Sequence, residues 1–417
     1  MESKATTLDN RKLFTPLKTS LLYLTIVLVS LSMANDYLPK PEDIYLYYDY
    51  STLVYKGSMP YRDFLFEYHP FALPFLLIPN LPNVLLGSPS FDRYMIFYHF
   101  EAYLLTFGIL LISWYLLRDL LSTEEANDRV PLLATACILF SFFIFRRFDI
   151  AAAFLFSLTI YLIHRKKPAW GGLVLGLATA TKLYPAVAVP FLLIYFWRVV
   201  KDRKSTFYHL GGVIAGVLIA FLPFVLLSFN GLVNFLKYHS ERNIQSESFW
   251  ASFLMAARTL NLTTVVHSID HGSSNLVSPW NPFLSSLSLI IMAAGYIIFF
   301  CFLWWQAGSP TFKPSTIWLI NAISVAIIWF ILTNKVFSPQ YLVWLLPFTP
   351  FWKGTRALIF MNMLALSFLI YPNLAPLIVT LEWLPFSVIM VRNILLLILL
   401  FLEVRALIKP DILSSHS

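Results

Sequence analysis

The sequence predicts an all-α, polytopic integral membrane protein that forms a single domain over residues 1–417. Of the 417 residues, 58% are hydrophobic, 17% are aromatic and 12% are charged, and the mean hydropathy is +0.71. A soluble domain carries about 25% charged residues, so this composition excludes a water-facing body. Helices rather than barrel strands must cross the membrane, because runs such as LLLILLFL at 395–402 are apolar on every face.

The apolar segments are numerous enough for about 10–12 transmembrane or re-entrant helices. Two neighbouring segments have only about 15 residues each and are separated by Lys182 and Pro185, so we expect a hairpin that does not fully cross. The block at 71–86, with its neighbour Pro70, holds four prolines and predicts an interfacial or re-entrant segment. The candidate crossings lie near 19–35, 94–117, 130–146, 148–164, 169–182, 184–198, 208–229, 281–304, 315–333, 340–352, 355–371 and 386–406.

The distribution of charge predicts the orientation in the membrane. With the N-terminus inside, most Lys and Arg residues fall in short cytoplasmic loops, as the positive-inside rule requires. Two long segments, 36–93 and 230–280, then lie on the outer face, and the tyrosines of the first predict amphipathic helices at the membrane interface. We expect a multi-pass protein of the plasma membrane with its chemistry on the extracytoplasmic side.

The net charge of +8 does not predict a nucleic-acid partner. The 30 Lys and Arg residues do not form one basic patch but are spread over loops on both sides of the membrane. The chain has no G-x-G-x-x-G motif and no P-loop, and its cytoplasmic loops are too short to build a nucleotide site. A soluble nucleotide sugar is therefore a poor candidate for a substrate.

The first outer segment carries two groups of ionisable residues. In EDIYLYYDY, Asp43 and Asp49 lie six residues apart, so a helix sets them on different faces. Helix capping and simple solvation are the plain interpretations of either residue. The second group lies between aromatic residues and has more polarity than a passive interfacial segment requires. It comprises Arg62, Asp63, Glu67 and His69 of YRDFLFEYHP.

Lys182 is the sharpest single signal, because it lies between two apolar arms in TATKLYPAVAVPFLL. An ammonium group inside a membrane is costly unless an anion pairs with it. Snorkelling to the interface is the alternative, but the adjacent Pro185 breaks the helix and directs the lysine toward a cavity. In the turn FRRFDI, the three residues Arg146, Arg147 and Asp149 leave two interpretations open: a structural pairing of arginine with aspartate, or ligand binding.

Two further clusters of polar residues follow at the ends of later apolar segments. Taken singly, each residue in them is compatible with a solvated loop. The first cluster, in KYHSERNIQSESFW, comprises His239, Glu241, Arg242, Gln245, Glu247 and Ser248. The second, in NKVFSPQYLVWLLP, comprises Asn334, Lys335, Ser338 and Gln340.

Taken in order, these motifs resemble glycosyltransferase family 87. The pattern is an acidic residue after the first span, then G-x-x-P-Y-R-D-F with E-Y-x-P, an R-x-D turn, K-L-Y-P, R-x-x-Q-x-E-S and K-V-F-S-P-Q-Y-L-x-W-L-L-P. The resemblance runs from about residue 36 to 350, and KVFSPQYLVWLLP is its most specific element. In EYHP, His69 stands where a second proline is expected. The resemblance implies the GT-C type of membrane fold and a polyprenyl-phosphate sugar as donor.

The resemblance also implies roles for individual residues. Asp43 is the expected general base of an inverting hexosyltransferase, with mannose as the expected sugar by family habit, and Asp49 is the alternative base. The expected ligands of the donor phosphate are Lys182, Arg242, Arg147 and Lys335. The remaining expected substrate contacts are Tyr61, Arg62, Glu67, His69, Asp149, His239, Gln245, Glu247 and Gln340. We expect no metal site and no cofactor, a divalent cation near Glu42 and Asp43 being the alternative.

Two other functions compete with sugar transfer to a lipid or glycan acceptor. A transporter or flippase of lipid-linked sugars would also have many spans and intramembrane charges. Such transporters are often built from two repeated halves, and no duplication is visible in this sequence. A non-catalytic subunit of an envelope-glycan assembly is the third possibility, in which the motifs would be scaffold.

Overall fold

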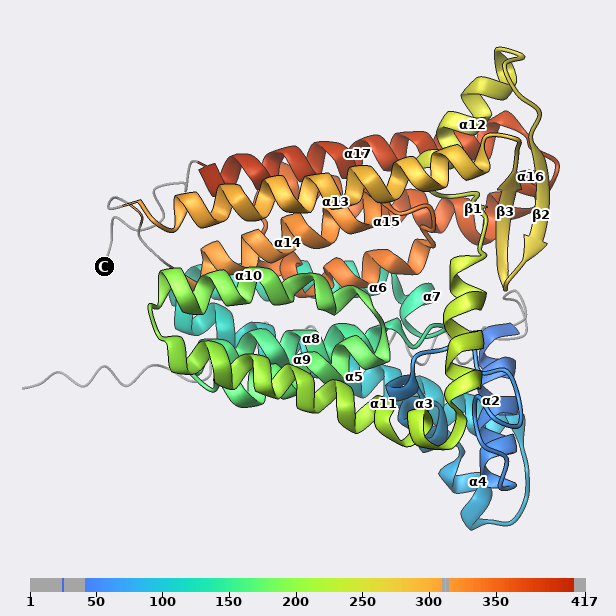
Figure 1. Cartoon of the computed structure of the whole chain (residues 1–417), viewed down its shortest axis with the longest axis horizontal. Coiled ribbons are helices and arrows are strands. Elements are labelled where there is room, and N and C mark those ends of the chain that lie inside the picture. The colour runs from blue at the N-terminus through green and yellow to red at the C-terminus, as the bar shows by residue number, and fades with distance from the viewer. Residues whose placement is uncertain (1–24, 26–41, 310–311, 313–314, 409–417) are drawn as a thin grey trace, which may run out of the picture.

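Long helices that run side by side form the body of the molecule (Figure 1). The structure is a computed structural model, and it describes residues 25, 42–309, 312 and 315–408. Within these residues, six helical segments are long and apolar enough to cross a membrane, which confirms an all-α polytopic membrane protein. They are α5 (Phe91–Leu120), α11 (Arg203–Ser240), α13 (Asn281–Gln306), α14 (Thr316–Thr333), the continuous stretch Thr355–Val379 and α17 (Trp383–Ile408). The predicted crossing at 19–35 lies outside the described residues.

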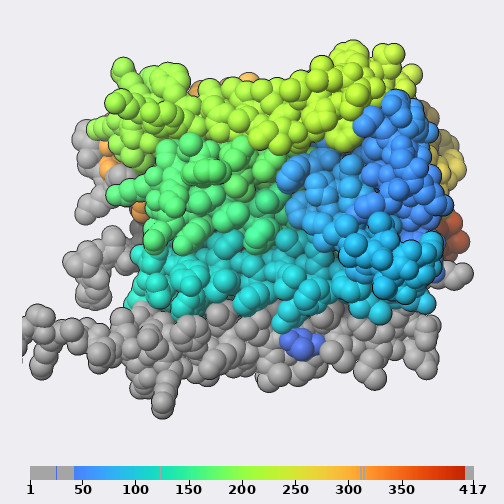
Figure 2. Space-filling model, turned by 90° about the horizontal axis from the view of Figure 1, so that it is seen from below, coloured from blue at the N-terminus to red at the C-terminus, as the bar shows by residue number. Residues whose placement is uncertain are grey.

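Shorter elements complete the bundle and cover one of its ends. Figure 1 places α2, α3, α4, α12, α16 and the strands at the end opposite the marked C-terminus. Figure 2 shows the same arrangement from another side, with α11 along one edge and the segments that follow residue 42 gathered at one end. The remaining helices are α2 (Glu42–Tyr55), η2 (Pro70–Ala72), α3 (Leu73–Leu77), η3 (Ile78–Asn80), α4 (Leu81–Leu85), α6 (Thr123–Leu139), α7 (Ser141–Ile144), α8 (Asp149–His164), α9 (Pro168–Thr181), η4 (Tyr184–Ala188), α10 (Val189–Ile194), η5 (Tyr195–Val199), α12 (Phe249–Thr259), η6 (Pro339–Phe351), α15 (Thr355–Phe368), η7 (Leu369–Leu374) and α16 (Ala375–Val379).

The helical hairpin expected at 169–198 is present, and both of its arms are short. Helix α9 has 14 residues and ends at Thr181, directly before Lys182. The second arm restarts at Tyr184 as a 3-10 turn because Pro185 cannot continue an α-helix from the first arm. At about 1.5 Å per residue, α9 is about 21 Å long, which is less than the ~30 Å hydrocarbon core.

The segment predicted as a crossing at 340–352 is a 3-10 helix, η6. It has 13 residues and contains Pro339, Pro347 and Pro350, whose missing N–H groups weaken an α-helical ladder. Because a 3-10 helix rises about 2.0 Å per residue, this segment reaches about 26 Å, further than an α-helix of equal length. Most of its side chains are buried among the surrounding helices.

Helices α9 and α11 cross at contact distance through glycines. A Cβ atom placed on Gly172 would lie 2.1 Å from the carbonyl oxygen of His209, and one on Gly216 would lie 2.3 Å from that of Leu173. Gly176 and Gly212 make equally close approaches, and the four-residue spacing puts each pair on one helix face. Small residues allow such approach in membrane helices. This close crossing with α11 holds α9 in place, and Lys182 directly follows the last residue of α9.

The tyrosines of the first outer segment are arranged differently from the prediction. We expected them at the membrane interface, but Tyr47, Tyr50 and Tyr61 are buried in an aromatic core that joins α2 to α5 and α11. Tyr45 and Tyr55 do remain exposed. The reason is that α2 lies against the bundle, so one of its faces is removed from both lipid and water. The proline-rich block at 71–86 forms the broken series η2, α3, η3 and α4.

The second outer segment contains a small antiparallel sheet that was not predicted. Its strands are β1 (Ile244–Gln245), β2 (Val266–Asp270) and β3 (Ser273–Val277), in the order β1-β3-β2. The turn between β2 and β3 has two residues, His271 and Gly272, both with positive φ, as a tight hairpin of this type requires.

Candidate active site

The residues singled out in the sequence come from segments that meet at the end of the bundle covered by α2 and the sheet. Asp43 lies in the first turn of α2, Arg147 lies between α7 and α8, and Asp149 is the first residue of α8. Lys182 follows α9, and Arg242 follows α11. The segment between α14 and η6 supplies Lys335. Each functional group is therefore held at a helix end, where the spanning helix fixes its position.

Asp43 forms an ion pair with Arg147, and both side chains are about one quarter to one third exposed. Asp49 is exposed and lies on a different face of α2, as the six-residue spacing predicts. Of the two aspartates, Asp43 is therefore the one that faces the cations. The ion pair joins segments that are about a hundred residues apart in the sequence.

Lys182 is held inward by Asp149. Its Nζ lies 2.7 Å from Asp149 Oδ1, and the indole Nε1 of Trp344 donates to the same oxygen at 2.7 Å. The ammonium also lies 5.2 Å from the ring centroid of Phe148 and 5.5 Å from those of Tyr341 and Trp344. The Lys182 side chain therefore points inward to Asp149 and does not snorkel to the membrane interface.

The alternative of an arginine–aspartate pairing within FRRFDI is wrong for Arg147 and Asp149. Arg147 pairs with Asp43 instead, and Asp149 pairs with Lys182.

The other two predicted phosphate ligands lack a carboxylate partner. Lys335 Nζ donates to the carbonyl oxygen of Ser240 at 3.1 Å. The buried Nε of Arg242 has no hydrogen-bond partner, and within the described part of the chain neither residue forms an ion pair. Burial lowers the pKa of Lys335, and the nearby charge of Arg242 lowers it further.

The four cations form one electrostatic group. Burial lowers the pKa of Lys182, the Asp149 carboxylate opposes that shift, and the nearby charges of Arg147 and Arg242 reinforce it. Asp43 and Asp149 neutralise two of the four positive charges through ion pairs. Positive charge is left uncompensated in a half-buried setting, which is the electrostatic requirement of an anion site.

Glu67 and two histidines border this group. The ring Nε2 of His239 donates to the Glu67 carbonyl oxygen at 2.9 Å, and the rings of His239 and His69 are 6.1 Å apart. Burial raises the pKa of the Glu67 carboxyl, and the charges of Arg242 and Asp43 act on it in opposite directions. Burial, His239 and Lys182 lower the pKa of His69 to about 3, so its ring is neutral at physiological pH.

Gln245 joins the two loops that carry Arg242 and Lys335. Its Nε2 donates to Ser338 Oγ at 2.6 Å, and its backbone N–H donates to the Lys335 carbonyl oxygen at 3.0 Å. The carbonyl oxygen of the Gln245 side chain is buried and has no partner among the described residues.

Three of the predicted substrate contacts have structural partners, and a fourth, Gln340, has no side-chain partner among the described residues. Tyr61 packs in the aromatic core, and its hydroxyl donates to the Tyr68 carbonyl oxygen at 2.5 Å. Arg62 is exposed and pairs with Asp63 at 2.9 Å. Glu247 is buried against Arg392. Gln340 is half-buried at the start of η6. The substrate-binding roles of these residues stay predictions.

Sequence reasoning missed Arg392, which is fully buried in α17. Its Nη1 donates to Glu247 Oε2 at 2.7 Å, its Nη2 donates to the Glu247 carbonyl oxygen at 2.6 Å, and its guanidinium lies 4.2 Å from the centroid of Phe337. Arg392 thus ties α17 to both loops that carry Arg242 and Lys335. A lone arginine in an apolar span is costly unless paired, and that signal was present in the sequence.

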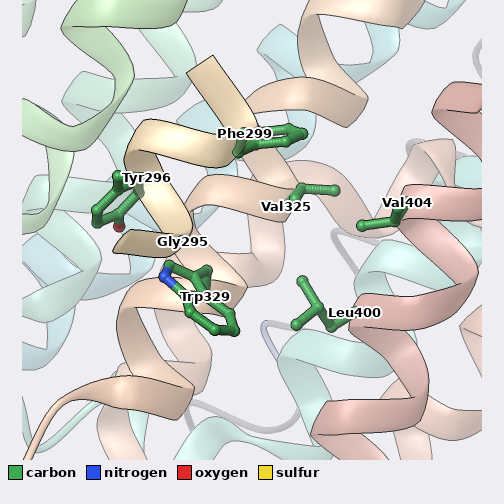
Figure 3. A pocket seen from close by; sticks show the side chains of 7 residues that line it. All are labelled: Gly295, Tyr296, Phe299, Val325, Trp329, Leu400 and Val404. Carbon is green, nitrogen blue, oxygen red and sulfur yellow. The ribbon is translucent and has the colours of Figure 1, made fainter. Parts of the chain in front are cut away.

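An apolar pocket of about 180 Å³ lies between α13, α14 and α17, away from these charges (Figure 3). The two polar atoms of its lining are already bonded to backbone: Tyr296 Oη donates to the Ala326 carbonyl oxygen and Trp329 Nε1 to that of Met292. No group there can act on a sugar, so the polar group at the bundle end is the candidate site.

Among the described residues, no group of three or more His, Cys, Asp or Glu side chains is arranged to hold a metal ion. Whether the reaction needs a divalent cation therefore stays a matter for prediction. The chemistry that the described side chains offer is that of a carboxylate base beside cations that bind an anion.

Comparison with known proteins agrees with the resemblance found in the motifs. The model of glycosyltransferase family 87 matches residues 66–332, which is more than half of the chain and lies inside the range from 36 to 350. Asp43 and the motif KVFSPQYLVWLLP fall outside the matched range. GPI mannosyltransferase 1 of Saccharomyces cerevisiae (strain ATCC 204508 / S288c) is 22% identical over 323 residues, covering 74% of this chain and 71% of the yeast protein. The chain belongs to glycosyltransferase family 87 and is a polytopic membrane glycosyltransferase.

Proposed function

We propose that this glycosyltransferase moves a hexose, mannose in the first instance, from a polyprenyl-phosphate sugar to a lipid or glycan acceptor on the extracytoplasmic face. The observation that carries the proposal is the pairing of one carboxylate, Asp43, with a group of four cations that keeps uncompensated positive charge. A phosphate leaving group needs those cations, and an acceptor hydroxyl needs a base. Mannose is favoured because the yeast relative is named a mannosyltransferase.

The proposed reaction is a single displacement. The oxygen of the acceptor hydroxyl attacks the anomeric carbon while the bond from that carbon to the donor phosphate oxygen breaks. Asp43 takes the hydroxyl proton, and the bonding electron pair leaves with polyprenyl phosphate. Lys182, Arg242, Arg147 and Lys335 stabilise the negative charge that grows on the phosphate. The cations supply electrostatic stabilisation without a cofactor.

Inversion of the anomeric centre follows from the proposed displacement, because only one carboxylate takes part. Three acidic residues that compete for the place of a covalent nucleophile are poorly placed for it: Glu42 and Asp49 are exposed, and Glu247 is engaged by Arg392. A beta-linked donor would then give an alpha-linked product. Glu67 is the acidic residue left to test, since it borders both Asp43 and Arg242.

The extracytoplasmic location is supported by the basic loops at the other end of the bundle. Those loops follow α8 and η5 and carry Arg165, Lys166, Lys167 and Lys201, and Arg203 begins α11 directly after the second loop; the positive-inside rule assigns these residues to the cytoplasm. We propose that the membrane in which the protein has this orientation is the plasma membrane. An impermeant thiol reagent tests it in a variant without Cys137 and Cys301. Cysteines at the exposed positions Lys56 and Glu241 should react from outside, and one at Lys166 only after permeabilisation.

Transfer itself is tested with purified protein in nanodiscs, a polyprenyl-phosphate mannose donor and a glycolipid acceptor. We expect Asp43→Asn to lower the turnover number about 10²- to 10⁴-fold, because general-base catalysis contributes that much. Asp49→Asn is the matched control and should stay close to wild type. Normal turnover of folded, donor-binding Asp43→Asn would remove Asp43 from the mechanism. Movement of the donor between leaflets without a new glycosidic bond would favour a flippase, and NMR of the product reports the anomeric configuration.

A further inference from the structure

The tip of the β2–β3 hairpin lies beside Glu67 and the end of α11. The ring of His271 is 4.8 Å from that of Tyr238. A Cβ atom placed on Gly272 would lie 3.5 Å from Glu67 Oε2 and 3.7 Å from the Tyr238 hydroxyl. Three segments far apart in the sequence thus present a carboxylate, a phenol and an imidazole within a few ångströms of one another. All three side chains are half-buried, so they are accessible from the outer end of the molecule.

The hairpin tip is held in one conformation by Asp270. Its Oδ1 accepts from Asn275 Nδ2 and His271 Nδ1, each at 2.9 Å, and its Oδ2 accepts from Ser268 Oγ at 2.6 Å. The two turn residues also have the positive φ angles of a tight hairpin. Polar groups fixed in this way lose little conformational entropy when a ligand binds.

Glu67 connects the hairpin tip to the proposed catalytic group. The charges of Arg242, Asp43 and His271 act on its carboxylate, and its backbone carbonyl oxygen accepts a hydrogen bond from His239. The Glu67 carboxylate accepts a hydrogen bond from the Tyr238 hydroxyl, and among the described residues no ion pair neutralises it, so it keeps the capacity to accept further hydrogen bonds. A molecule bound at the hairpin tip would therefore lie beside the segment that carries His239 and Arg242.

We propose that Glu67, Tyr238, His271 and the hairpin tip form the subsite for the acceptor, and that the acceptor headgroup is a neutral, hydroxyl-rich ring such as a hexose or another polyol. A carboxylate accepts two hydroxyl hydrogen bonds, and an aromatic ring covers an apolar sugar face. Glu67 and Asp270 disfavour a phosphorylated headgroup by repulsion, whereas the four cations attract the donor phosphate on the other side. This proposal rests on the proposed sugar transfer, and it identifies the residues that bind the acceptor and the chemical class of the acceptor headgroup.

Kinetics separate this subsite from the donor site. In nanodiscs, Tyr238→Phe and His271→Ala should each raise the KM for a glycolipid acceptor with a neutral headgroup, about tenfold or more for the double variant, because hydrogen bonds to a carboxylate network and a ring contact are lost. The donor KM should stay unchanged. His267→Ala is the matched control, since His267 lies on the same hairpin and bonds to Ser274 rather than to Tyr238.

Binding of a small probe gives a second readout that does not depend on turnover. Saturation-transfer NMR with methyl α-mannoside should show a signal for the wild type that falls at least about fivefold in the double variant, and mannose 1-phosphate should compete poorly. An unchanged acceptor KM together with an unchanged NMR signal in the double variant would overturn the subsite while leaving sugar transfer intact. A wild type that binds the mannoside but transfers no sugar would support the subsite and overturn the proposed function instead.

Discussion

The molecule has ionic networks at both ends of its helix bundle, and they differ in how completely the charges are paired. At the end away from the candidate site, Glu403 of α17 pairs with Arg356 at 2.7 Å and accepts from Ser324 Oγ at 2.5 Å. Glu125 pairs with Lys353 and lies 3.6 Å from Arg129. Each of these three cations has a carboxylate partner. At the candidate site, Arg242 and Lys335 have none among the described residues.

The difference separates two uses of charge in a membrane protein. A buried ion pair whose members are all satisfied fixes the helices that carry it, because losing either partner leaves an uncompensated charge. A group with surplus charge gains nothing for the fold and is favourable only when an opposite charge arrives. We therefore assign the paired network to stability and the unpaired one to ligand binding, and the following variants test that assignment.

The largest effect on stability is expected from Glu403→Ala in the fully paired network. The change leaves Arg356 without its partner in a buried setting, which costs about 3–5 kcal/mol in the free energy of unfolding. Thermal unfolding in detergent measures the loss, and the donor KM of the protein that remains folded should not change. Glu241→Ala is the control, since Glu241 is exposed and pairs only with Lys237 one helical turn away. An unaltered unfolding temperature for Glu403→Ala would remove the structural assignment.

The glycine crossing that supports the candidate site should also be sensitive to substitution. Gly216→Leu places a Cβ atom 2.3 Å from a carbonyl oxygen of α9, so the helices must separate. Overpacking of this kind costs about 1–3 kcal/mol, and the displaced end of α9 carries Lys182, so transfer should fall as well. Gly211→Leu is a matched control in the same helix, because no atom lies within 4 Å of a Cβ at that position. Equal unfolding temperatures for the two variants would contradict the tight crossing.

Arg242 tests the unpaired network directly. Arg242→Met should raise the donor KM about 10- to 100-fold, because a hydrogen bond to a charged group contributes about 1.5–3 kcal/mol. Stability should not fall, since the wild-type guanidinium forms no ion pair with any of the described residues. Lys353→Met at the opposite end should give the reverse result, an unchanged donor KM with lower stability. If Arg242→Met lowers stability and leaves the donor KM alone, the two networks have the same structural role.

The spanning helices could be predicted from sequence because the signal is local. The apolar blocks at 94–117, 281–304 and 315–333 correspond to α5, α13 and α14 within about three residues, since hydropathy over a helix length does not depend on packing partners. The broken hairpin at Lys182 was likewise predicted by one charge and one proline. The sheet was missed because β1 has only two residues and its pairing is set by distant segments.

The candidate site was predictable in composition but not in pairing. The motifs identified the four cations that form one electrostatic group. The partners of those cations depend on contacts between distant segments, as the pair of Arg147 with Asp43 shows, and no local pattern contains that information. Arg392 is a different case, because a single arginine in an apolar span predicts a buried partner without naming it.

The smallest expected effect is a change in the acid sensitivity of folding at His69, the residue that stands where the family pattern has a proline. The folded protein lowers the pKa of His69 to about 3 from 6.5. The unfolded chain therefore binds a proton near pH 6.5 that the folded chain does not bind, so the stability contributed by the neutral ring is present above pH 6.5 and is lost as the pH falls toward 3. Between pH 7 and pH 5 the loss of stability due to His69 amounts to less than about 2 kcal/mol.

We expect the unfolding temperature of His69→Gln to fall less between pH 7 and pH 5 than that of the wild type, because glutamine does not titrate. The cause is burial of a neutral ring beside His239 and Lys182, so Lys182→Met should also reduce the acid sensitivity by removing one nearby positive charge. Parallel pH profiles for wild type and His69→Gln would mean that the ring takes up a proton in the folded protein, and His69 would then be a candidate proton carrier in the site.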